Sequence, residues 1–424
     1  MSPANQADAP RVLVLASAHS YRLEAFQAAA DRLGVTVVRG LDAPPALTGG
    51  GLAFLRLDFR DPARATRQVI KAARAGAFQA VIPTDDATVL LAAHLAAALG
   101  LPHNSLAAAA ASRDKHQMRQ SLARAGLPTP WFRLFSTQDD PTDVAAQTPF
   151  PCVLKPTCLS GSRGVIRADH AAQFVAAFAR LRRLLEPLGL TEILVEGYIP
   201  GREFALEGLL RHGELTVLAL FDKPDPLEGP YFEETIYVTP SREPAATQAA
   251  IAGCVADAAR ALGLSEGAVH GEVRVPSAAA GAWLVELAGR SIGGLCGQTL
   301  RFATRAEVSL EELILRQALG WPIVSTEREQ QAGGVMMLPI PARGTLAGWS
   351  GLDEARAVPG IESVEITARE NYPLEPLPEG ESYLGFIFAR GATPAVVEAA
   401  LRAAHGCLRF DIEAPLMVLP VAAR

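Results

Sequence analysis

The sequence predicts a protein of mixed α/β and α+β class, with a doubly wound parallel sheet at its N-terminus and a small α+β domain at its C-terminus. Three observations support this. A chain of 424 residues exceeds the roughly 250–300 residues that one hydrophobic core organises. Strands alternate with helices over the first hundred residues, and after the polar break STEREQQ (325–331) several short strands precede one clear helix. We therefore expect three domains, at residues 1–110, 111–325 and 326–424.

The N-terminal domain is predicted from alternating hydrophobic patterns. Strands alternating with helices indicate βαβ units and a parallel sheet. No G-x-G-x-x-G follows the first strand, so a dinucleotide fingerprint is absent and the domain is expected to be a scaffold that contributes to a substrate site. The expected strands are RVLVLA (11–16), VTVV (35–38) and AVIP (80–83), and the expected helices cover 21–33, 63–75 and 86–99, with a Pro- and Gly-rich loop at 43–51.

The rest of the chain changes in character. A helix is expected at 112–125, followed by strands and loops richer in glycine and charge as far as about Trp321. The last module is expected to contain strands at VMMLPI, VEIT and YLGFIFA and a helix near 394–404.

Composition excludes several classes of protein. Hydrophobic residues make up 49% and charged residues 20%, which is typical of a packed globular protein. A net charge of −6 argues against a nucleic-acid surface, and no apolar run approaches the roughly 20 residues that span a bilayer. The first ten residues lack the features of a signal peptide. The five cysteines have no C-x-x-C spacing, so we expect reduced thiols in a cytoplasmic protein and no structural zinc.

The first motif with chemical meaning is FPCVLKPTCLSGSRGV (150–165). A strand delivers Lys155, and a loop containing Ser160, Gly161, Ser162 and Gly164 leads to another strand. Glycines let the backbone approach phosphate oxygens closely, and successive N–H groups form an anion-binding concavity. A plain β-hairpin turn with an exposed lysine explains the segment equally well. It is not a P-loop, because no GK[ST] follows.

The second motif is TEILVEGYIPGREFALEGLL (191–210). A buried strand is expected to end at Glu196, and GYIPG forms a bend before an alternating strand that carries Glu203 and Glu207. Backbone groups of such a linker can bind an adenine edge while a carboxylate binds ribose hydroxyls. A surface hairpin with solvated acids is the alternative.

The third motif consists of two alternating strands, VHGEVRV (269–275) and AWLVELAGR (282–290), separated by PSAAAGA. If they pair as a hairpin centred near Ala279, Glu272 lies opposite Glu286, and His270 shares their face. Facing carboxylates repel, and hard oxygen donors favour magnesium or manganese. Arg290 could then bind a phosphate or an oxyanion. The alternative is a half-exposed sheet face with a fortuitous pair.

Between the second and third motifs lies ALFDKPDPLEGPYFEETIYVTPSR (219–242). Lys223 could reach a transferring phosphate, and the loop around Pro230, Phe232 and Glu234 could frame a substrate. An ordinary loop is an equally good interpretation.

The motifs in this order resemble the ATP-grasp superfamily and, within it, the L-amino acid ligases that make dipeptides. The resemblance covers nearly the whole chain. It is carried by SRDKHQMRQSLARAGLPTP, the KP…SGSRGV loop, VEGYIPGREFALEG, the HGE strand and ELAGRSIGG. It implies an ATP-grasp fold with a mobile lid at about 130–195.

The resemblance also implies roles for individual residues. Its cofactors would be ATP and Mg²⁺ or Mn²⁺, with Glu272 and Glu286 as metal ligands and Arg290 and Lys223 as catalytic residues. The residues implied for nucleotide binding are Lys115 and Lys155, the phosphate-covering loop Ser160, Gly161, Ser162 and Gly164, the adenine contacts Glu196, Tyr198 and Ile199, and the ribose contact Glu203. The residues expected near the substrates are Glu234, Tyr237, His270, Gly293 and Gly294.

Two positions depart from the family pattern. Many members read E-x-N-x-R where this chain has Ala288 between Glu286 and Arg290, so a second metal would be held by Glu286, phosphates and water alone. Relatives often read E-x-G-H where this chain has Tyr237, which can donate a hydrogen bond but is not a cation near pH 7.

The expected activity is ATP-dependent joining of a small carboxylate, such as an amino acid, to an amine through an acyl phosphate. The alternatives are a biotin-carboxylase-like or purine-pathway member of the superfamily and a nucleotide-binding protein without turnover. A homodimer is possible. The sequence does not identify the two substrates or the base that deprotonates the amine.

Overall fold

The computed structural model describes residues 9–17, 20, 22–42, 54–277, 281–303 and 308–414. The described chain forms two compact units, each assembled from separate segments. The first comprises residues 1–133, 199–222 and 239–330, and the second 134–198, 223–238 and 331–424. The predicted loop at 43–51 and the predicted hairpin centre at Ala279 lie outside the described residues.

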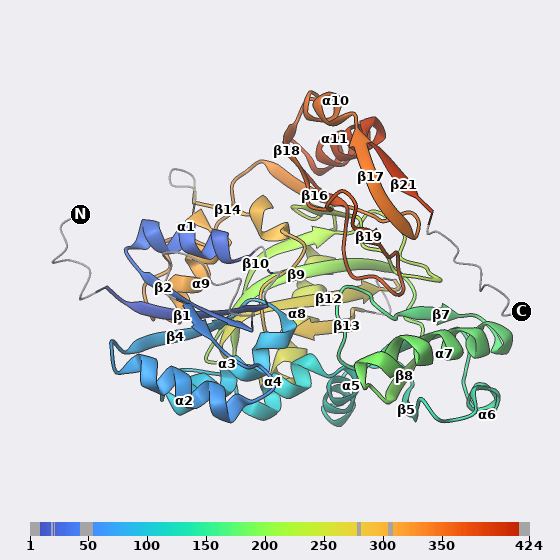
Figure 1. The fold of residues 1–424 in the computed structure, drawn as a ribbon, viewed down its shortest axis with the longest axis horizontal. Helices are drawn as coiled ribbons and strands as arrows, with labels where there is room; N and C mark the ends of the chain where they lie inside the picture. The colour runs from blue at the N-terminus through green and yellow to red at the C-terminus, as the bar shows by residue number, and fades with distance from the viewer. Residues whose placement is uncertain are drawn as a thin grey trace, which may run out of the picture. The chain divides into compact units, whose positions relative to one another are not determined.

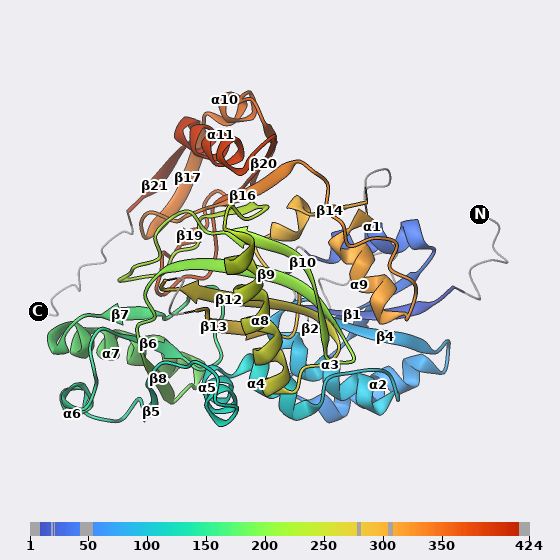
Figure 2. The same cartoon turned by 180° about the vertical axis from the view of Figure 1, so that it is seen from behind.

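The first unit begins with the predicted parallel sheet. Its strand order is β3-β2-β1-β4, and all three pairings are parallel. Helices α2 and α3 lie on one side of these strands and α1 on the other (Figures 1 and 2), as a doubly wound sheet requires. The elements are β1 (Arg11–Ser17), α1 (Leu23–Leu33), β2 (Thr36–Asp42), β3 (Phe54–Arg56), α2 (Pro62–Ala73), β4 (Phe78–Pro83) and α3 (Asp86–Ala98). The predicted strands and helices of this region are therefore confirmed, and β3 is an addition.

The single helix predicted at 112–125 is wrong in one respect, because the chain breaks at Asp114. Helix α4 (Leu106–Arg113) ends there and α5 (Lys115–Arg124) begins. Asp114 has extended backbone angles, and its carboxylate accepts a hydrogen bond from the Gln117 amide at 2.8 Å. An N-cap interaction of this kind favours a new helix start over continuation. The break places Lys115 in the first turn of α5.

An antiparallel group of four strands forms the centre of the first unit. Its order is β13-β12-β9-β10, with β9 (Arg202–Arg211), β10 (Glu214–Asp222), β12 (Gly267–Val275) and β13 (Trp283–Ala288). Helix α8 (Ala245–Leu262) covers one face (Figure 2), where Ile251 and Val255 pack against Val269 and Val273. The unit also contains η4 (Cys296–Thr299), β14 (Arg301–Phe302), β15 (Val308–Ser309) and α9 (Leu310–Ala318).

The second unit contains two further antiparallel sheets and a group of three adjacent strands, β16, β20 and β18. One sheet has the order β5-β8-β6-β7 and packs on α7. The C-terminal strands include the order β16-β20-β18, packed on α11, and a sheet β19-β17-β21. The elements are β5 (Phe132–Ser136), α6 (Pro141–Ala146), β6 (Cys152–Pro156), β7 (Ile166–Ala168), α7 (Ala171–Leu185), η3 (Glu186–Leu188), β8 (Glu192–Gly197), β11 (Ile236–Thr239), β16 (Ala332–Leu338), β17 (Gly344–Ser350), α10 (Leu352–Arg356), β18 (Ile361–Ile366), β19 (Pro373–Leu374), β20 (Gly385–Gly391), α11 (Pro394–Cys407) and β21 (Arg409–Glu413).

The short strands and the helix predicted for the C-terminal module correspond to β16, β18, β20 and α11, so its α+β character is confirmed. Among the described residues, no helix is both long enough and apolar enough to cross a membrane. All five cysteines are free thiols.

Candidate active site

The third motif folds as the predicted hairpin. Strands β12 and β13 pair antiparallel, with Glu272 opposite Glu286 and His270 opposite Ala288. The register slips after Glu272, so that Arg274 pairs with Trp283. Had the pairing continued without the slip, Arg274 would lie opposite Leu284. The predicted carboxylate pair is therefore confirmed as a geometric feature, and a bulge adjoins it.

Strand β9 completes this face. It pairs with β12 so that Glu203 lies opposite Arg274 and Glu207 opposite His270. Residues directly opposite each other in an antiparallel pair project from the same face. The alternate residues Val269 and Val273 instead pack into the core beneath α8. The alternating pattern of the sequence thus gathers ionisable side chains on one face of three strands and aliphatic ones on the other.

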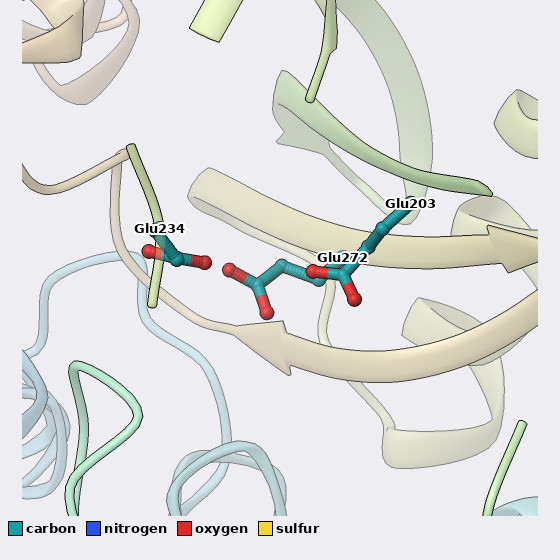
Figure 3. Close-up of side chains that lie close together, drawn as sticks. All are labelled: Glu203, Glu234 and Glu272. Atoms are coloured by element: carbon teal, nitrogen blue, oxygen red, sulfur yellow. The ribbon is translucent and has the colours of Figure 1, made fainter. Parts of the chain in front are cut away.

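Figure 3 shows the carboxylates of Glu203 and Glu272 close together on this face; an oxygen of one lies within 4.8 Å of an oxygen of the other. The sequence predicted Glu286 as the partner of Glu272 and assigned Glu203 to ribose. The structure places the carboxylates of both Glu203 and Glu286 beside Glu272. Glu203 is buried and accepts a hydrogen bond from Arg274 at 2.7 Å, and Arg274 also donates to the Ile199 carbonyl oxygen at 2.8 Å.

Glu286 is paired with a cation from α5. The Lys115 ammonium lies 3.0 Å from its Oε1. Burial alone would lower the pKa of Lys115, but the carboxylates of Glu286, Asp86 and Glu272 together outweigh it and the pKa is raised. Lys115 therefore remains charged, and it neutralises one of the two facing carboxylates.

His270 lies between two carboxylates. Its Nδ1 is 3.6 Å from Glu207 and its Nε2 is 3.7 Å from Glu272. Burial acts to lower the pKa of His270, yet its contacts with Glu207 and Glu272 raise it. Burial raises the pKa of Glu207, which is fully buried. Glu207 Oε1 and His270 Nδ1 have no hydrogen-bond partner among the described residues. These two buried atoms can therefore still form hydrogen bonds with a bound molecule or with water.

Arg290 follows β13 and is held by a residue that the sequence analysis missed. Its guanidinium donates to both carboxylate oxygens of Asp86, at 3.0 and 2.7 Å, and to the Ser291 carbonyl oxygen at 3.0 Å. Burial acts against both charges, but each partner stabilises the other. The pKa of Asp86 is lowered and that of Arg290 is raised. Asp86 begins α3 directly after β4, the carboxyl end of a parallel strand, where ligand sites of such sheets lie; that position was an available signal.

Two buried groups fix the segment that follows Arg290. Glu207 accepts a hydrogen bond from the Ile292 amide at 2.9 Å, and Arg22 of the N-terminal sheet domain donates to the Ile292 carbonyl oxygen and to Ser291 Oγ. Gly293 is exposed, and a Cβ there would meet no atom within 4 Å. Gly294 has a left-handed φ of 58°. A side chain at Gly293 would therefore extend into open space.

A cavity of about 180 Å³ lies in the first unit beside these residues. Arg290 and Ser291 line it, and it extends along α3 past Val89 and Ala93 to Asn104. The wall is mainly apolar with a few polar groups, as is typical of small-molecule sites.

The second unit carries the predicted glycine-rich loop, between β6 and β7. Lys155 is buried in β6 and forms an ion pair with Glu196 of β8. Gly164 has a φ of 73°, and a Cβ there would lie 2.8 Å from Pro156 Cγ. Only glycine fits this position without displacement. Gly161 and Ser162 also have left-handed angles, at 61° and 54°, so the loop turns tightly between its two strands.

The other predicted residues of this unit form two small groups. Tyr198 lies between the Phe232 ring, stacked at 6.4 Å, and the Arg167 guanidinium, 4.1 Å from the tyrosine ring centroid. Lys223 forms an ion pair with Glu234 at 2.6 Å and lies 4.9 Å from the Tyr237 ring centroid. The structure therefore brings together Lys223, Glu234 and Tyr237, which all come from the segment 219–242.

Comparisons with known proteins show which domains and folds this chain is similar to. Residues 148–299 match the model of the ATP-grasp domain, and residues 336–413 match that of L-amino acid ligase C-terminal domain 2. The crystal structure of L-amino acid ligase from Bacillus licheniformis superposes with a TM-score of 0.78 at 25% identity, covering 95% of this chain and 99% of that one.

Curated proteins match over shorter stretches. The chain is 27% identical over 279 residues to the uncharacterized protein y4rH of Sinorhizobium fredii, covering 62% of this chain and 53% of that protein. It is 25% identical over 227 residues to alanine–anticapsin ligase of Bacillus amyloliquefaciens, covering 49% of this chain and 48% of that protein. The chain thus spans about half the length of these curated relatives.

Proposed function

We propose that this chain, whose residues 148–299 match the model of the ATP-grasp domain, is an ATP-dependent carboxylate–amine ligase. It would form an amide or peptide bond through an acyl phosphate and release ADP and phosphate. The observation that carries this proposal is the β12–β13 ladder, which sets Glu272 opposite Glu286 and leads directly to Arg290. The match to an L-amino acid ligase C-terminal domain favours an amino acid as the carboxylate.

The carboxylates fit a hard divalent cation. Glu272 and Glu286 face each other, with side chains 19% and 25% exposed, and both offer only oxygen donors, which magnesium prefers. The ammonium of Lys115 already forms an ion pair with Glu286. The two carboxylates therefore attract positive charge at this position. When bound, magnesium would neutralise charge on the nucleotide phosphates. Glu272 and Glu286 would hold it.

Arg290 would stabilise the oxyanion when the amine attacks the acyl phosphate. Asp86 fixes two of its nitrogens from one side, so its orientation is set before substrate arrives. Preorganised donors of this kind contribute about 2.7–4 kcal/mol to transition-state stabilisation. The cavity beside Arg290 and the open space at Gly293 would accommodate the substrate groups, and His270 would contribute a polar wall.

The second unit would bind the nucleotide. The amides at Ser160–Gly164 and Lys155 would bind phosphates, and Lys223 would stabilise the transferring group. Glu196 and Tyr198 of this unit would contact adenine. Glu234 and Tyr237 of the same unit would border the substrate. For the first unit, taken by itself, the proposed roles are nucleotide contact for Lys115, adenine contact for Ile199 and ribose contact for Glu203. The tight turn at Gly164 and the burial of Lys155 support this assignment.

The test is an array of carboxylates paired with amines, in which magnesium-dependent ADP and phosphate release is measured and the product is weighed. ADP appearing only with particular pairs, with a condensed product, would establish the ligase. AMP and pyrophosphate would refute the acyl-phosphate route, and turnover with bicarbonate and biotin would favour the carboxylase alternative. Glu272→Gln should remove ADP release, and Glu214→Gln, at an exposed position of β10, is the matched control.

A further inference from the structure

The glycine-rich loop of the second unit is covered by a segment from the C-terminal module. We define this strap as residues 375–381, which follow β19. The Gly164 amide donates a hydrogen bond to the Pro378 carbonyl oxygen at 2.8 Å. Arg163 Nε donates to the Glu379 carbonyl oxygen at 3.0 Å, and its guanidinium lies 3.3 Å from the Glu381 carboxylate. Two consecutive residues of the loop are therefore tied to the strap.

A stronger contact joins the strap to the helix behind the loop. Arg180 of α7 donates to both carboxylate oxygens of Glu379, at 2.6 and 2.7 Å, and also to the Tyr231 hydroxyl. Bidentate arginine–carboxylate pairs fix geometry as well as contributing energy. The hydrogen bond from Arg180 is the main reason that the pKa of Glu379 is lowered. Tyr231 in turn bridges to Ile166, the first residue of β7, so the pair adjoins the strand that leaves the loop.

The strap is itself a fixed structure. The Gly380 amide donates to the Pro376 carbonyl oxygen at 2.9 Å, and a Cβ at Gly380 would lie 1.8 Å from the Glu375 carbonyl oxygen. At its start, Glu375 accepts from Arg343, with nitrogen–oxygen distances of 2.9 and 2.7 Å. A tight turn that only glycine permits thus presents Pro378 and Glu379 to the loop.

We propose that the strap is a latch, and that Arg163, Arg180 and Glu379 are positioning residues that hold the phosphate-binding loop closed over the nucleotide. This inference rests on the proposed function, because it assumes that the loop contacts phosphates. The closed loop excludes water, which would otherwise hydrolyse the acyl phosphate. Release of the latch therefore weakens nucleotide binding and uncouples ADP release from amide formation.

The test reverses the charge of Arg180 and of Glu379, separately and together, in the whole chain. Arg180→Glu and Glu379→Arg should each raise the KM for ATP about 3- to 10-fold, the range expected for loss of a partly exposed bidentate pair. Each should also raise the ratio of ADP to condensed product. The doubly reversed protein should recover most of both losses, which a merely structural disturbance would not do. Arg260→Glu, which breaks an exposed pair with Asp257 on α8, is the control.

Hydrogen–deuterium exchange supplies a readout that does not depend on turnover. The Gly164 amide should exchange about tenfold faster in either single variant than in the parent protein, with and without MgADP, because its acceptor is the latch carbonyl. Unchanged Gly164 exchange, or a double variant as impaired as the sum of the singles, would overturn the latch. Glu379→Gln, which keeps the shape, replaces the reversals if those variants do not fold. If no substrate pair releases ADP but Gly164 exchange responds as expected, the ligase proposal fails and the latch stands.

Discussion

The pair between Asp86 and Arg290 yields a prediction that separates stability from catalysis. Asp86→Asn keeps the shape of the side chain and removes its charge, leaving Arg290 without its bidentate partner. Breaking a fully buried ion pair by removing one partner costs about 3–5 kcal/mol. Because the two side chains are 13% and 17% exposed, we expect a smaller loss of about 2–3 kcal/mol in the free energy of unfolding. In urea this corresponds to a midpoint shift of about 0.5–1 M.

The same substitution should reduce turnover more than it weakens nucleotide binding. Asp86 touches neither a reacting atom nor a phosphate in the proposed mechanism; it orients the guanidinium of Arg290. Misplacement of a catalytic group by about 1 Å can cost about 10²-fold in rate. We therefore expect kcat for amide formation to fall about 100-fold while the KM for ATP changes little. Arg290→Gln and the double variant complete a mutant cycle, and a coupling energy of at least about 1 kcal/mol is expected for residues in contact.

The pH dependence of stability independently tests whether the charge of Asp86 stabilises the folded protein. The pKa of Asp86 is lowered in the folded protein, so the charged carboxylate contributes stability above the unfolded pKa of about 3.9. That contribution is lost as the pH falls from there through the lower folded pKa. The difference in stability between the parent protein and Asp86→Asn should therefore be full near pH 7 and shrink below about pH 4. Equal stability and equal kcat at pH 7 would refute the assignment; Asp257→Asn, at an exposed position of α8, controls for loss of charge alone.

Three further outcomes are expected. Glu272→Gln and Glu286→Gln should each lower magnesium-dependent ADP release by at least about 100-fold, measured by a coupled ADP assay, while nucleotide binding without magnesium persists; full activity in either variant would contradict the metal assignment. Gly164→Ala should destabilise the loop by about 1–2 kcal/mol, because its Cβ would lie 2.8 Å from Pro156 Cγ at a φ of 73°, and a raised KM for ATP would report it. Burial raises the pKa of Cys152 to about 12, so its thiol should resist alkylation at pH 8 until the protein unfolds, as mass spectrometry of modified peptides can follow.

Local patterns predicted much of this structure. Alternation of polar and apolar residues predicted β12 and β13, and the symmetric spacing of their glutamates predicted that Glu272 lies opposite Glu286, as the structure confirms. The alternation did not predict the bulge after Glu272, which shifts the register by one residue so that Arg274 pairs with Trp283. Nothing in VHGEVRV announces an extra residue on the partner strand, since a bulge is set by packing on both faces.

Contacts between distant parts of the chain were beyond such reasoning. Asp86 reaches Arg290 across 204 residues of sequence, and Arg22 reaches Ile292 across 270. Taken alone in the sequence, Asp86 is explained as a residue at the start of a helix, and Arg22 and Arg290 are explained as surface arginines. Only the packing of the parallel sheet against the antiparallel strands brings the halves together, and charge partners in buried sites are chosen by that packing and not by sequence spacing.

The ladder of β9, β12 and β13 explains why stability and chemistry can vary separately in this fold. Strand β12 sends Val269 and Val273 into the core under α8, where removal of methyl groups costs about 1–3 kcal/mol but leaves the charged face intact. It sends His270 and Glu272 to the opposite face, where a change of charge alters the site and removes little buried apolar area. Because successive residues of a strand point to opposite sides, the site is fixed by a core that contains none of its chemistry. Substrate range can therefore change on one face while the folding energy is conserved on the other.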